Sequence, residues 1–281
     1  MHCVQWRLWL APWVQRLRGL VILLVVPTLS ASVIQLNDGL YYEHTLHWGE
    51  SLQSTLNIHN PTLQVQTVML YQMDERFEQG VPDYLPPGSR QRSNAAWLEL
   101  GAEHIILPPQ STVSVPYRLQ IPNDPQLSGS YWSIVMVQAV QEIELELAEQ
   151  PLSGLRVQQL FRTAARIVTH IVTDPPARPQ LNVQHSRLVS SEDVPIQLEL
   201  SLANDGDVAL HLHVFAEVIG ANGDQLGRFF PRLEQARLLP NHSVQRHIDF
   251  SELPPGQYEV IVVAENHDGH VFGARYQILI E

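Results

Sequence analysis

The feature that most constrains the fold of this chain is a succession of short apolar runs separated by turn-forming residues. Between residues 97 and 137, three such runs are interrupted by Pro-Pro, by Pro-Asn-Asp-Pro and by Ser-Gly-Ser. Runs rich in β-branched and aromatic residues between turn formers are typical of antiparallel strands. Helical periodicity of useful length is absent after residue 32. The sequence therefore predicts an all-β protein.

The strand pattern predicts two immunoglobulin-like β-sandwich domains in tandem. Its 281 residues are enough for two domains of ordinary size. We expect the first domain, with long loops, at residues 33–173 and the second at 180–281. Residues 174–179 (D-P-P-A-R-P) hold three prolines and predict a semi-rigid linker. Within the first domain the polar segment 74–96 predicts a long loop, and 141–160 predicts a long acidic hairpin arm.

The N-terminus has the composition of a secretory signal peptide. Residues 1–18 carry three arginines and no acid, and the apolar run G-L-V-I-L-L-V-V (19–26) leads to T-L-S-A-S. We expect a signal peptide at 1–32, cleaved near Ala31–Ser32, and a periplasmic or secreted protein. The run is shorter than the roughly 20 residues that cross a bilayer, so we expect no stable membrane span in the mature chain. Cleavage would also remove the single cysteine, Cys3.

The charge balance argues against a nucleic-acid partner. The chain holds 29 acidic residues against 17 basic ones, all of them arginine, and its formal net charge is −12. A protein that binds the phosphate backbone needs a cluster of basic residues. The arginines of this chain form no such cluster in the sequence, so we expect no nucleic-acid binding.

Catalytic and metal-binding motifs give no positive signal. The 13 histidines include the i, i+2 pair His211 and His213, and His267 and His270 flank a predicted hairpin tip. A zinc site needs three or four converging ligands, and no cysteine or acid stands at the spacing of a known motif. The G-x-S-x-G motif of serine hydrolases is absent as well. We expect no enzyme, no cofactor and no metal, and a metal-dependent enzyme is the weakest alternative.

The strongest functional feature is the last predicted strand of the first domain, residues 161–173. If this strand lies at a sheet edge, it could accept a strand from another protein. The alternative interpretation is an ordinary core strand with both faces covered. Its alternating side chains and its arginines supply the candidate partner-binding residues, which are Arg162, Arg166, Ile167, Thr169 and Ile171.

Residues 33–173 also resemble a known family. An asparagine-terminated strand (L-N-I-H-N-P, 56–61) is followed by I-I-L-P-P-Q-S-T-V-S-V-P-Y-R-L-Q-I-P (105–122) and by G-S-Y-W-S-I-V-M-V (129–137). This pattern resembles the N-terminal domain of bacterial immunoglobulin-like periplasmic pilus-assembly chaperones and of WxL-interacting surface proteins. The second domain resembles only a generic immunoglobulin-like module that contains P-P-G-Q-Y (254–258).

The resemblance implies a non-enzymatic protein-binding factor, chaperone-like or a component of surface or pilus assembly. Its partner would be a pilin-like or other envelope protein. Pilus chaperones anchor the subunit carboxylate with an arginine in the first strand and a lysine in the last. Here residues 33–48 contain no basic residue and the chain has no lysine, so Arg162 and Arg166 are the only candidates for that role. WxL-interacting proteins usually end in a membrane span, and this chain shows none. A carbohydrate-binding or structural cell-envelope module remains the alternative.

Overall fold

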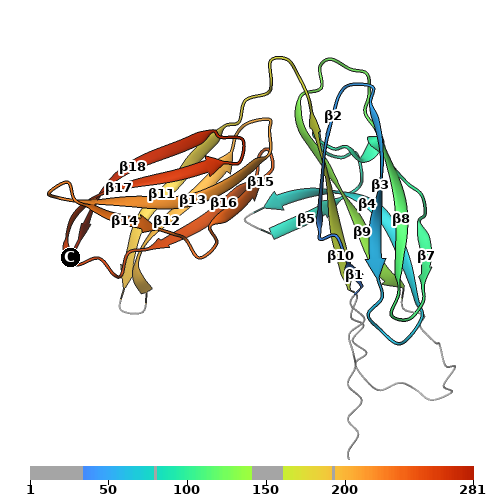
Figure 1. Cartoon of the computed structure of the whole chain (residues 1–281), viewed down its shortest axis with the longest axis horizontal. Helices are drawn as coiled ribbons and strands as arrows, with labels where there is room; N and C mark the ends of the chain where they lie inside the picture. Colours follow the sequence, from blue (N-terminus) through green and yellow to red (C-terminus); the bar gives the residue numbers. More distant parts are fainter. Residues whose placement is uncertain (1–33, 79–80, 141–160, 192–193) are drawn as a thin grey trace, which may run out of the picture. The chain divides into compact units, whose positions relative to one another are not determined.

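The computed structural model describes residues 34–78, 81–140, 161–191 and 194–281. These residues form an all-β protein of two immunoglobulin-like sandwiches with a single 3-10 turn, η1 (Ala95–Trp97) (Figure 1). The predicted signal peptide at 1–32 and the predicted arm at 141–160 lie outside the described residues. We call β1–β10 the first sandwich and β11–β18 the second sandwich.

The first sandwich is built from two sheets. One sheet has the order β1-β3-β8-β6, formed by β1 (Gln35–Leu36), β3 (Ser51–His59), β8 (Thr112–Gln120) and β6 (Leu98–Leu100). The other, which we call the β9 sheet, has the order β2-β10-β9-β4-β5, and β7 pairs with β4. Its strands are β2 (Tyr41–Leu46), β10 (Arg162–Ile171), β9 (Gly129–Val140), β4 (Gln66–Glu78), β5 (Val81–Leu85) and β7 (His104–Leu107).

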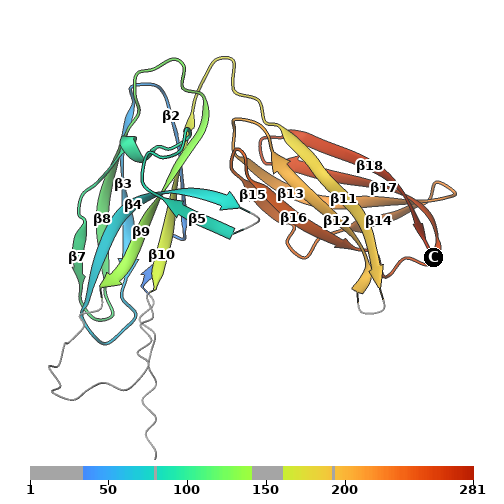
Figure 2. The ribbon, with the colours of Figure 1, turned by 180° about the vertical axis from the view of Figure 1, so that it is seen from behind.

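The first strand region serves both sheets. β1 pairs antiparallel with β3, whereas β2 pairs parallel with β10. The chain crosses between the sheets at residues 37–40, where Gly39 has a φ of +87° that a residue with a Cβ rarely adopts. The crossing is visible at the blue end of the ribbon in Figures 1 and 2. It decides where β2 begins to cover the edge of β10.

Strand alternation builds the core of each sandwich. In β8 the buried residues Val115, Tyr117 and Leu119 alternate with exposed neighbours, as expected of a strand with one face on a core. They join a cluster that includes Leu56 and Ile58 of β3 and also draws on β4, β9 and β10. The expected fold class, tandem immunoglobulin-like sandwiches, is confirmed.

The second sandwich repeats this plan around a separate core. Three strands form a sheet in the order β11-β12-β16, namely β11 (Leu181–Ser191), β12 (Val194–Asn204) and β16 (Ser243–Asp249). The facing sheet has the order β14-β13-β17-β18, and β15 pairs with β13. Its strands are β14 (Gln225–Phe229), β13 (Leu210–Gly220), β17 (Gly256–Asn266), β18 (Val271–Ile280) and β15 (Gln235–Leu238).

The structure corrects the expectation of a long loop at residues 74–96. β4 continues to Glu78 and turns back as β5, so Asp74 pairs with Leu85 and Arg76 with Asp83. The segment D-E-R-F-E is mostly charged and therefore resembles a loop in sequence. It forms a strand because Asp74 and Glu75 are buried and bound to partners from elsewhere in the chain.

A buried asparagine ends one strand in each sandwich. Asn60 follows β3 and Asn204 ends β12, and neither side chain is exposed. The Asn60 amide donates to the carbonyl oxygens of Gln64, Leu107 and Pro108. The Asn204 amide donates to the carbonyl oxygens of Val208 and Leu238, and its Oδ1 accepts the backbone N–H of Gly206. Each asparagine thus satisfies backbone groups that water cannot reach.

We predict that Asn204→Ala lowers the free energy of unfolding by about 3 kcal/mol, because at least two buried carbonyl groups lose their donor. Asn60→Ala should cost a similar amount in the first sandwich. The control is Asn182→Ala, which removes an exposed hydrogen bond to Asp205 and should change stability by less than about 0.5 kcal/mol. Chemical denaturation followed by circular dichroism measures all three. Equal losses for Asn182→Ala and Asn204→Ala would contradict this assignment.

Candidate functional site

The candidate site lies on the outer face of the β9 sheet, away from the core of the first sandwich. Side chains of β10 alternate between two environments. Ala165, Ile167 and Ile171 are buried in the core of the first sandwich. Val168 on the opposite face packs with Trp132 of β9 and with residues of the second sandwich. Both faces of this strand are therefore covered.

A nearly buried ion pair marks one part of this face. The Arg166 guanidinium donates from Nε to Glu75 Oε2 at 2.8 Å and from an Nη to Glu75 Oε1 at 2.6 Å. Glu75 is only 2% exposed, and the Arg166 side chain is 22% exposed. Two-pronged bonds of this kind are the strongest form of arginine–carboxylate contact. Arg166 is consequently already neutralised by a carboxylate of its own chain.

Tyr41 lies beside two guanidinium groups, one from each sandwich. Arg166 stands 5.2 Å and Arg237 4.7 Å from the centre of the Tyr41 ring. These distances are those of cation–π contacts. Burial raises the pKa of Tyr41 to about 12, although the two arginines act in the other direction. The phenol is therefore neutral at physiological pH, and the ring serves as a platform for the two cations.

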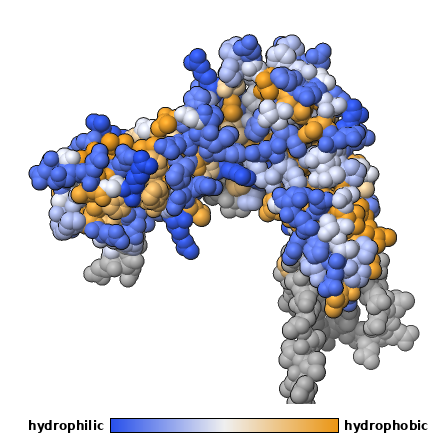
Figure 3. Space-filling model, in the orientation of Figure 1, coloured by the Kyte–Doolittle hydropathy of each residue, from blue (hydrophilic) through white to orange (hydrophobic). Residues whose placement is uncertain are grey.

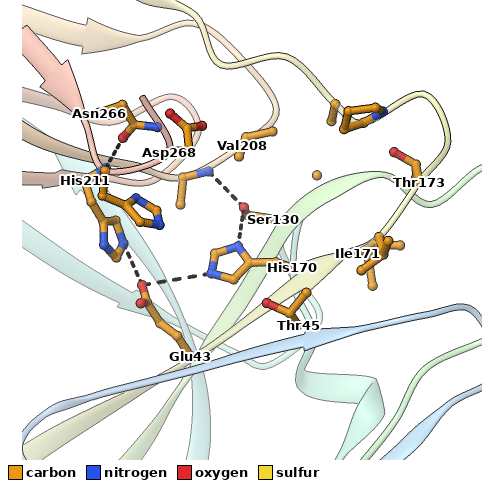
Figure 4. Close-up of a pocket in the computed structure, with 16 residues that line it drawn as sticks. Glu43, Thr45, Ser130, His170, Ile171, Thr173, Val208, His211, Asn266 and Asp268 are labelled. Carbon is orange, nitrogen blue, oxygen red and sulfur yellow. Dashed lines mark hydrogen bonds and ion pairs between the residues drawn. The ribbon is translucent and has the colours of Figure 1, made fainter. Parts of the chain in front are cut away.

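A second part of the face is a cavity of about 390 Å³ lined by residues of both sandwiches and by residues 173, 176 and 177 (Figure 4). Glu43 Oε1 lies 2.7 Å from His211 Nε2 and 4.0 Å from His170 Nε2. Burial would raise the pKa of Glu43, but the hydrogen bond from His211 and electrostatic attraction to basic neighbours, Arg237 among them, lower it overall. The carboxylate is thus held in its charged form.

Ser130, His170 and Glu43 follow one another in the order of a nucleophile, a base and an acid. Ser130 Oγ is 2.9 Å from His170 Nδ1, and Figure 4 shows the three side chains in sequence. However, Ser130 has no exposed surface, and its Oγ accepts the backbone N–H of Ala209 at 2.8 Å. A nucleophile must reach a substrate carbonyl, and this oxygen cannot. The arrangement holds two parts of the chain together and performs no acyl transfer.

The contact between the sandwiches is close at Gly129 and Ser130. The Ser130 N–H donates to the Asp207 carbonyl oxygen at 2.8 Å, and Arg92 forms an ion pair with the Asp207 carboxylate. A Cβ added at Gly129 would collide with the Asp207 carbonyl, and Gly129 has a φ of +77°. Only glycine permits this approach. The turn S-G-S (128–130), which interrupts two apolar runs in the sequence, therefore also meets the second sandwich.

The edge of β10 is paired along only part of its length. β9 pairs with all ten residues of the strand, from Arg162 to Ile171. β2 pairs with β10 only from Arg166 onward. Within the described residues, the edge of Arg162–Ala165 therefore has no strand partner on the side away from β9. Near it the Thr163 hydroxyl donates to the Ile34 carbonyl oxygen, and Leu40 in the crossing is 55% exposed.

The five predicted partner-binding residues fall into two groups. Arg162 is exposed at the start of β10, and Arg166 is partly exposed but bound to Glu75. Ile167, Thr169 and Ile171 are buried, and Thr169 Oγ1 accepts a hydrogen bond from the Asn94 amide. Their side chains cannot reach a partner, because their face packs into the first sandwich. Only the first four residues of β10, Arg162–Ala165, have an edge without a strand partner among the described residues.

Several residues of the site lacked a sequence signal. Glu75 stood in the expected loop, and Tyr41 and Arg237 belong to no motif. Glu75 and Arg166 are 91 positions apart, and strand register alone brings them together. Phe77 is the only apolar residue of D-E-R-F-E, so the segment has no alternation that would predict that β4 continues.

Comparisons with known proteins add an architectural likeness. No family model matches the chain, and no curated protein matches it. The chain is similar to a solved chaperone–tip adhesin complex of CFA/I fimbriae, with 12% identity over 88% of this chain and 98% of that chain and a TM-score of 0.44. It is similar to the CsuC–CsuE chaperone–tip adhesion subunit complex of Csu pili from Acinetobacter baumannii, with 12% identity, 88% and 98% coverage and a TM-score of 0.41.

The chain is also similar to the E. coli chaperone DraB, with 11% identity, 89% and 98% coverage and a TM-score of 0.39. Each of these three structures contains a protein described as a chaperone, and the likeness to them is one of fold. In the described residues no helix is long and apolar enough to span a membrane. Nor do three or more histidine, aspartate or glutamate side chains of these residues form a group that could hold a metal ion.

We predict that Glu75→Gln lowers the free energy of unfolding by about 2 kcal/mol, because it leaves the partly buried Arg166 without its counter-charge. The matched control is Glu199→Gln, which removes the acid of an exposed ion pair with Arg187 and should cost less than about 1 kcal/mol. Denaturant titration of both variants gives the difference. An equally small loss in Glu75→Gln would show that the pair contributes little to stability.

Proposed function

We propose that this protein is an exported, non-enzymatic protein-binding factor that acts in a chaperone-like way in surface or pilus assembly. In this proposal an extended segment of another envelope protein adds as a strand to the edge of β10 at Arg162–Ala165. The observation that carries it is the incomplete pairing of β10, whose first four residues have a partner strand on one side only. Backbone groups along such an edge are ready to pair with another chain.

The direction of the backbone groups supports the same edge. The Arg166 N–H donates to the Leu40 carbonyl oxygen, toward the side of β2. Because successive residues of a strand alternate in direction, the N–H groups of Ala164 and Arg162 also face this side. A partner strand placed there would continue the line of β2 and accept these donors.

Exposed apolar side chains lie at the same end of the β9 sheet but across β9 and β4 from the open edge, where they add contact area for a partner that spans this end of the sheet. Thr67 of β4 pairs with Val140 of β9 on one side and with Ile106 of β7 on the other. Arg162 of β10 pairs with Gln138 of β9. Ile106 is 67% exposed, and the neighbouring Leu63 and Val65 are 78% and 60% exposed. Figure 3 shows hydrophobic surface on the β7 side of the first sandwich. Apolar side chains gathered at one end of a domain favour protein contact.

The roles of the two arginines differ in this proposal. Arg166 is bound by Glu75, so a partner carboxylate would have to compete with a carboxylate already in place. Arg162 is exposed and has no acidic partner among the described residues. We therefore assign Arg162, rather than Arg166, to an acidic group of the partner. The signal-like N-terminus supports export to the periplasm, where pilin-like or other envelope proteins are available as partners.

The proposal is tested by placing a photo-crosslinking amino acid at position 164 in cells that produce the protein. We expect a crosslinked envelope protein at this position and a much weaker product at position 187, on an exposed part of β11. Mass spectrometry of the product should locate the crosslink in an extended segment of the partner. Equal products at the two positions would exclude a specific edge.

We also predict that Ala164→Pro lowers the yield of the partner complex roughly tenfold, because proline removes the N–H that faces the open edge. Ala164→Val keeps this donor and should retain binding, which makes it the matched control. Thermal unfolding of both variants must show that the sandwich remains folded. Full binding by a folded Ala164→Pro protein would contradict strand addition at this edge.

A further inference from the structure

The contact between the two sandwiches contains histidines whose neutral form the structure requires. Hydrogen bonds from backbone N–H groups of Ser130 and Ala209 cross the contact, and Trp132, Val168 and Leu239 form its apolar centre. His170 lies beside these hydrogen bonds, and His242 lies beside the apolar centre. Each histidine occupies a place that is unfavourable for a positive charge.

The hydrogen bonds of Ser130 determine which proton His170 carries. Ser130 Oγ accepts the Ala209 N–H, and the only described acceptor for its own hydrogen is His170 Nδ1. His170 is therefore neutral, with its proton on Nε2. A proton added at Nδ1 would leave the Ser130 hydroxyl hydrogen without an acceptor, and Ser130 has no exposed surface. Protonation of His170 thus disrupts the chain of bonds that joins the sandwiches.

The groups around His170 compensate only one positive charge. Glu43 of β2 is 4.0 Å away but already accepts from His211 of β13 at 2.7 Å. The His267 ring stands 4.9 Å from that of His211, and His44 also acts on His170 electrostatically. Asp268, the other acid of the cavity, is bound to His270. Several imidazoles therefore share one available carboxylate.

His242 of the second sandwich is buried between aromatic rings of the first. Its ring centre is 4.8 Å from that of Phe77 and 5.3 Å from that of Trp132. It is 7% exposed, and its Nε2 has no hydrogen-bond partner. The charged groups that act on it are Arg166 of β10 and Arg90 of the loop after β5, both cations. Glu75 is already paired with Arg166 and therefore offers no free carboxylate to a protonated His242.

We propose that the contact between the two sandwiches is a proton-controlled latch, closed while His170 and His242 are neutral and released when they take up protons. Release breaks the Ser130–Ala209 and Ser130–Asp207 hydrogen bonds and exposes the Trp132 and Leu239 side chains. The two cores are separate, so each sandwich stays folded when the latch opens.

The pH range follows from proton linkage. Burial, with Arg166 and Arg90, lowers the pKa of His242 from 6.5 to about 4, and burial likewise lowers the pKa of His170. The open form binds protons more readily, so the stability of the closed form is complete above pH 6.5 and is lost as the pH falls toward 4. For His242 alone, the opening equilibrium rises about 30-fold between about pH 7.5 and about pH 5.

Hydrogen exchange of the Ser130 and Ala209 amides tests the latch directly, because both amides donate across the contact. We expect their opening equilibrium, corrected for intrinsic exchange, to rise at least about 30-fold from about pH 7.5 to about pH 5. The core amides of Leu56 and Val262 report on unfolding and should change far less. Equal changes at the contact and the core amides, or no change at the contact, would overturn the proposal.

Three variants separate the latch from general acid sensitivity. His242→Phe keeps an aromatic ring between Phe77 and Trp132 but cannot titrate, and should remove most of the 30-fold effect. His170→Asn places an amide oxygen where Nδ1 accepts, and should remove the remaining pH dependence. Gly129→Ala, which collides with Asp207, gives the open reference at every pH.

The exposed His185→Gln is the control and should behave as the unmodified protein. Unchanged pH dependence in both folded His242→Phe and folded His170→Asn would refute the latch. If either histidine variant fails to fold, the exchange profile of the unmodified protein against the Gly129→Ala reference still decides the question. Contact amides that remain fully protected at about pH 5 in the unmodified protein would then exclude it.

Discussion

The arrangement of the first sandwich depends on the way β10 is enclosed. From Arg166 onward the strand is paired with β9 on one edge and with β2 on the other. One of its faces packs into the core of the first sandwich, and the other meets the second sandwich through Val168. A strand enclosed on four sides has no freedom to shift register, because a shift of one residue would exchange its two faces. This fixed register is what brings Arg166 to Glu75 and His170 to Ser130.

The enclosure also explains where polar groups are tolerated. A charge removed from water must be paired, or the group must stay neutral. Glu75 satisfies the first condition through Arg166, and His242 satisfies the second through a pKa lowered to about 4. The same face thus contains a charged pair and a histidine that stays neutral until the pH falls toward 4. Phe77 lies near both groups, with its ring centre 4.8 Å from that of His242 and 6.0 Å from the guanidinium carbon of Arg166.

Most of the fold could be predicted from local sequence patterns, and the exceptions have a physical cause. β8 and β12 alternate between apolar and polar residues and follow turn formers, and such signals act over short distances. The expected loop at 74–96 was wrong at its beginning, where β4 and β5 form a hairpin. Charged residues dominate D-E-R-F-E, and their burial depends on partners such as Arg166 and Ser93, which no local pattern reveals.

The candidate site was less accessible to prediction, because alternation says which residues share a face but not what covers that face. The pattern of β10 correctly separated Ile167 and Ile171 from Val168, yet it could not assign either face to the core. Assignment required the register with β9 and the position of β2, both set by contacts at least 24 residues away in sequence. Ser130, His170 and Glu43 are a second example, because the distances between them do not by themselves reveal their role. Their distances suggest catalysis, and only the burial of Ser130 and its bond to Ala209 show that the group joins two sandwiches instead.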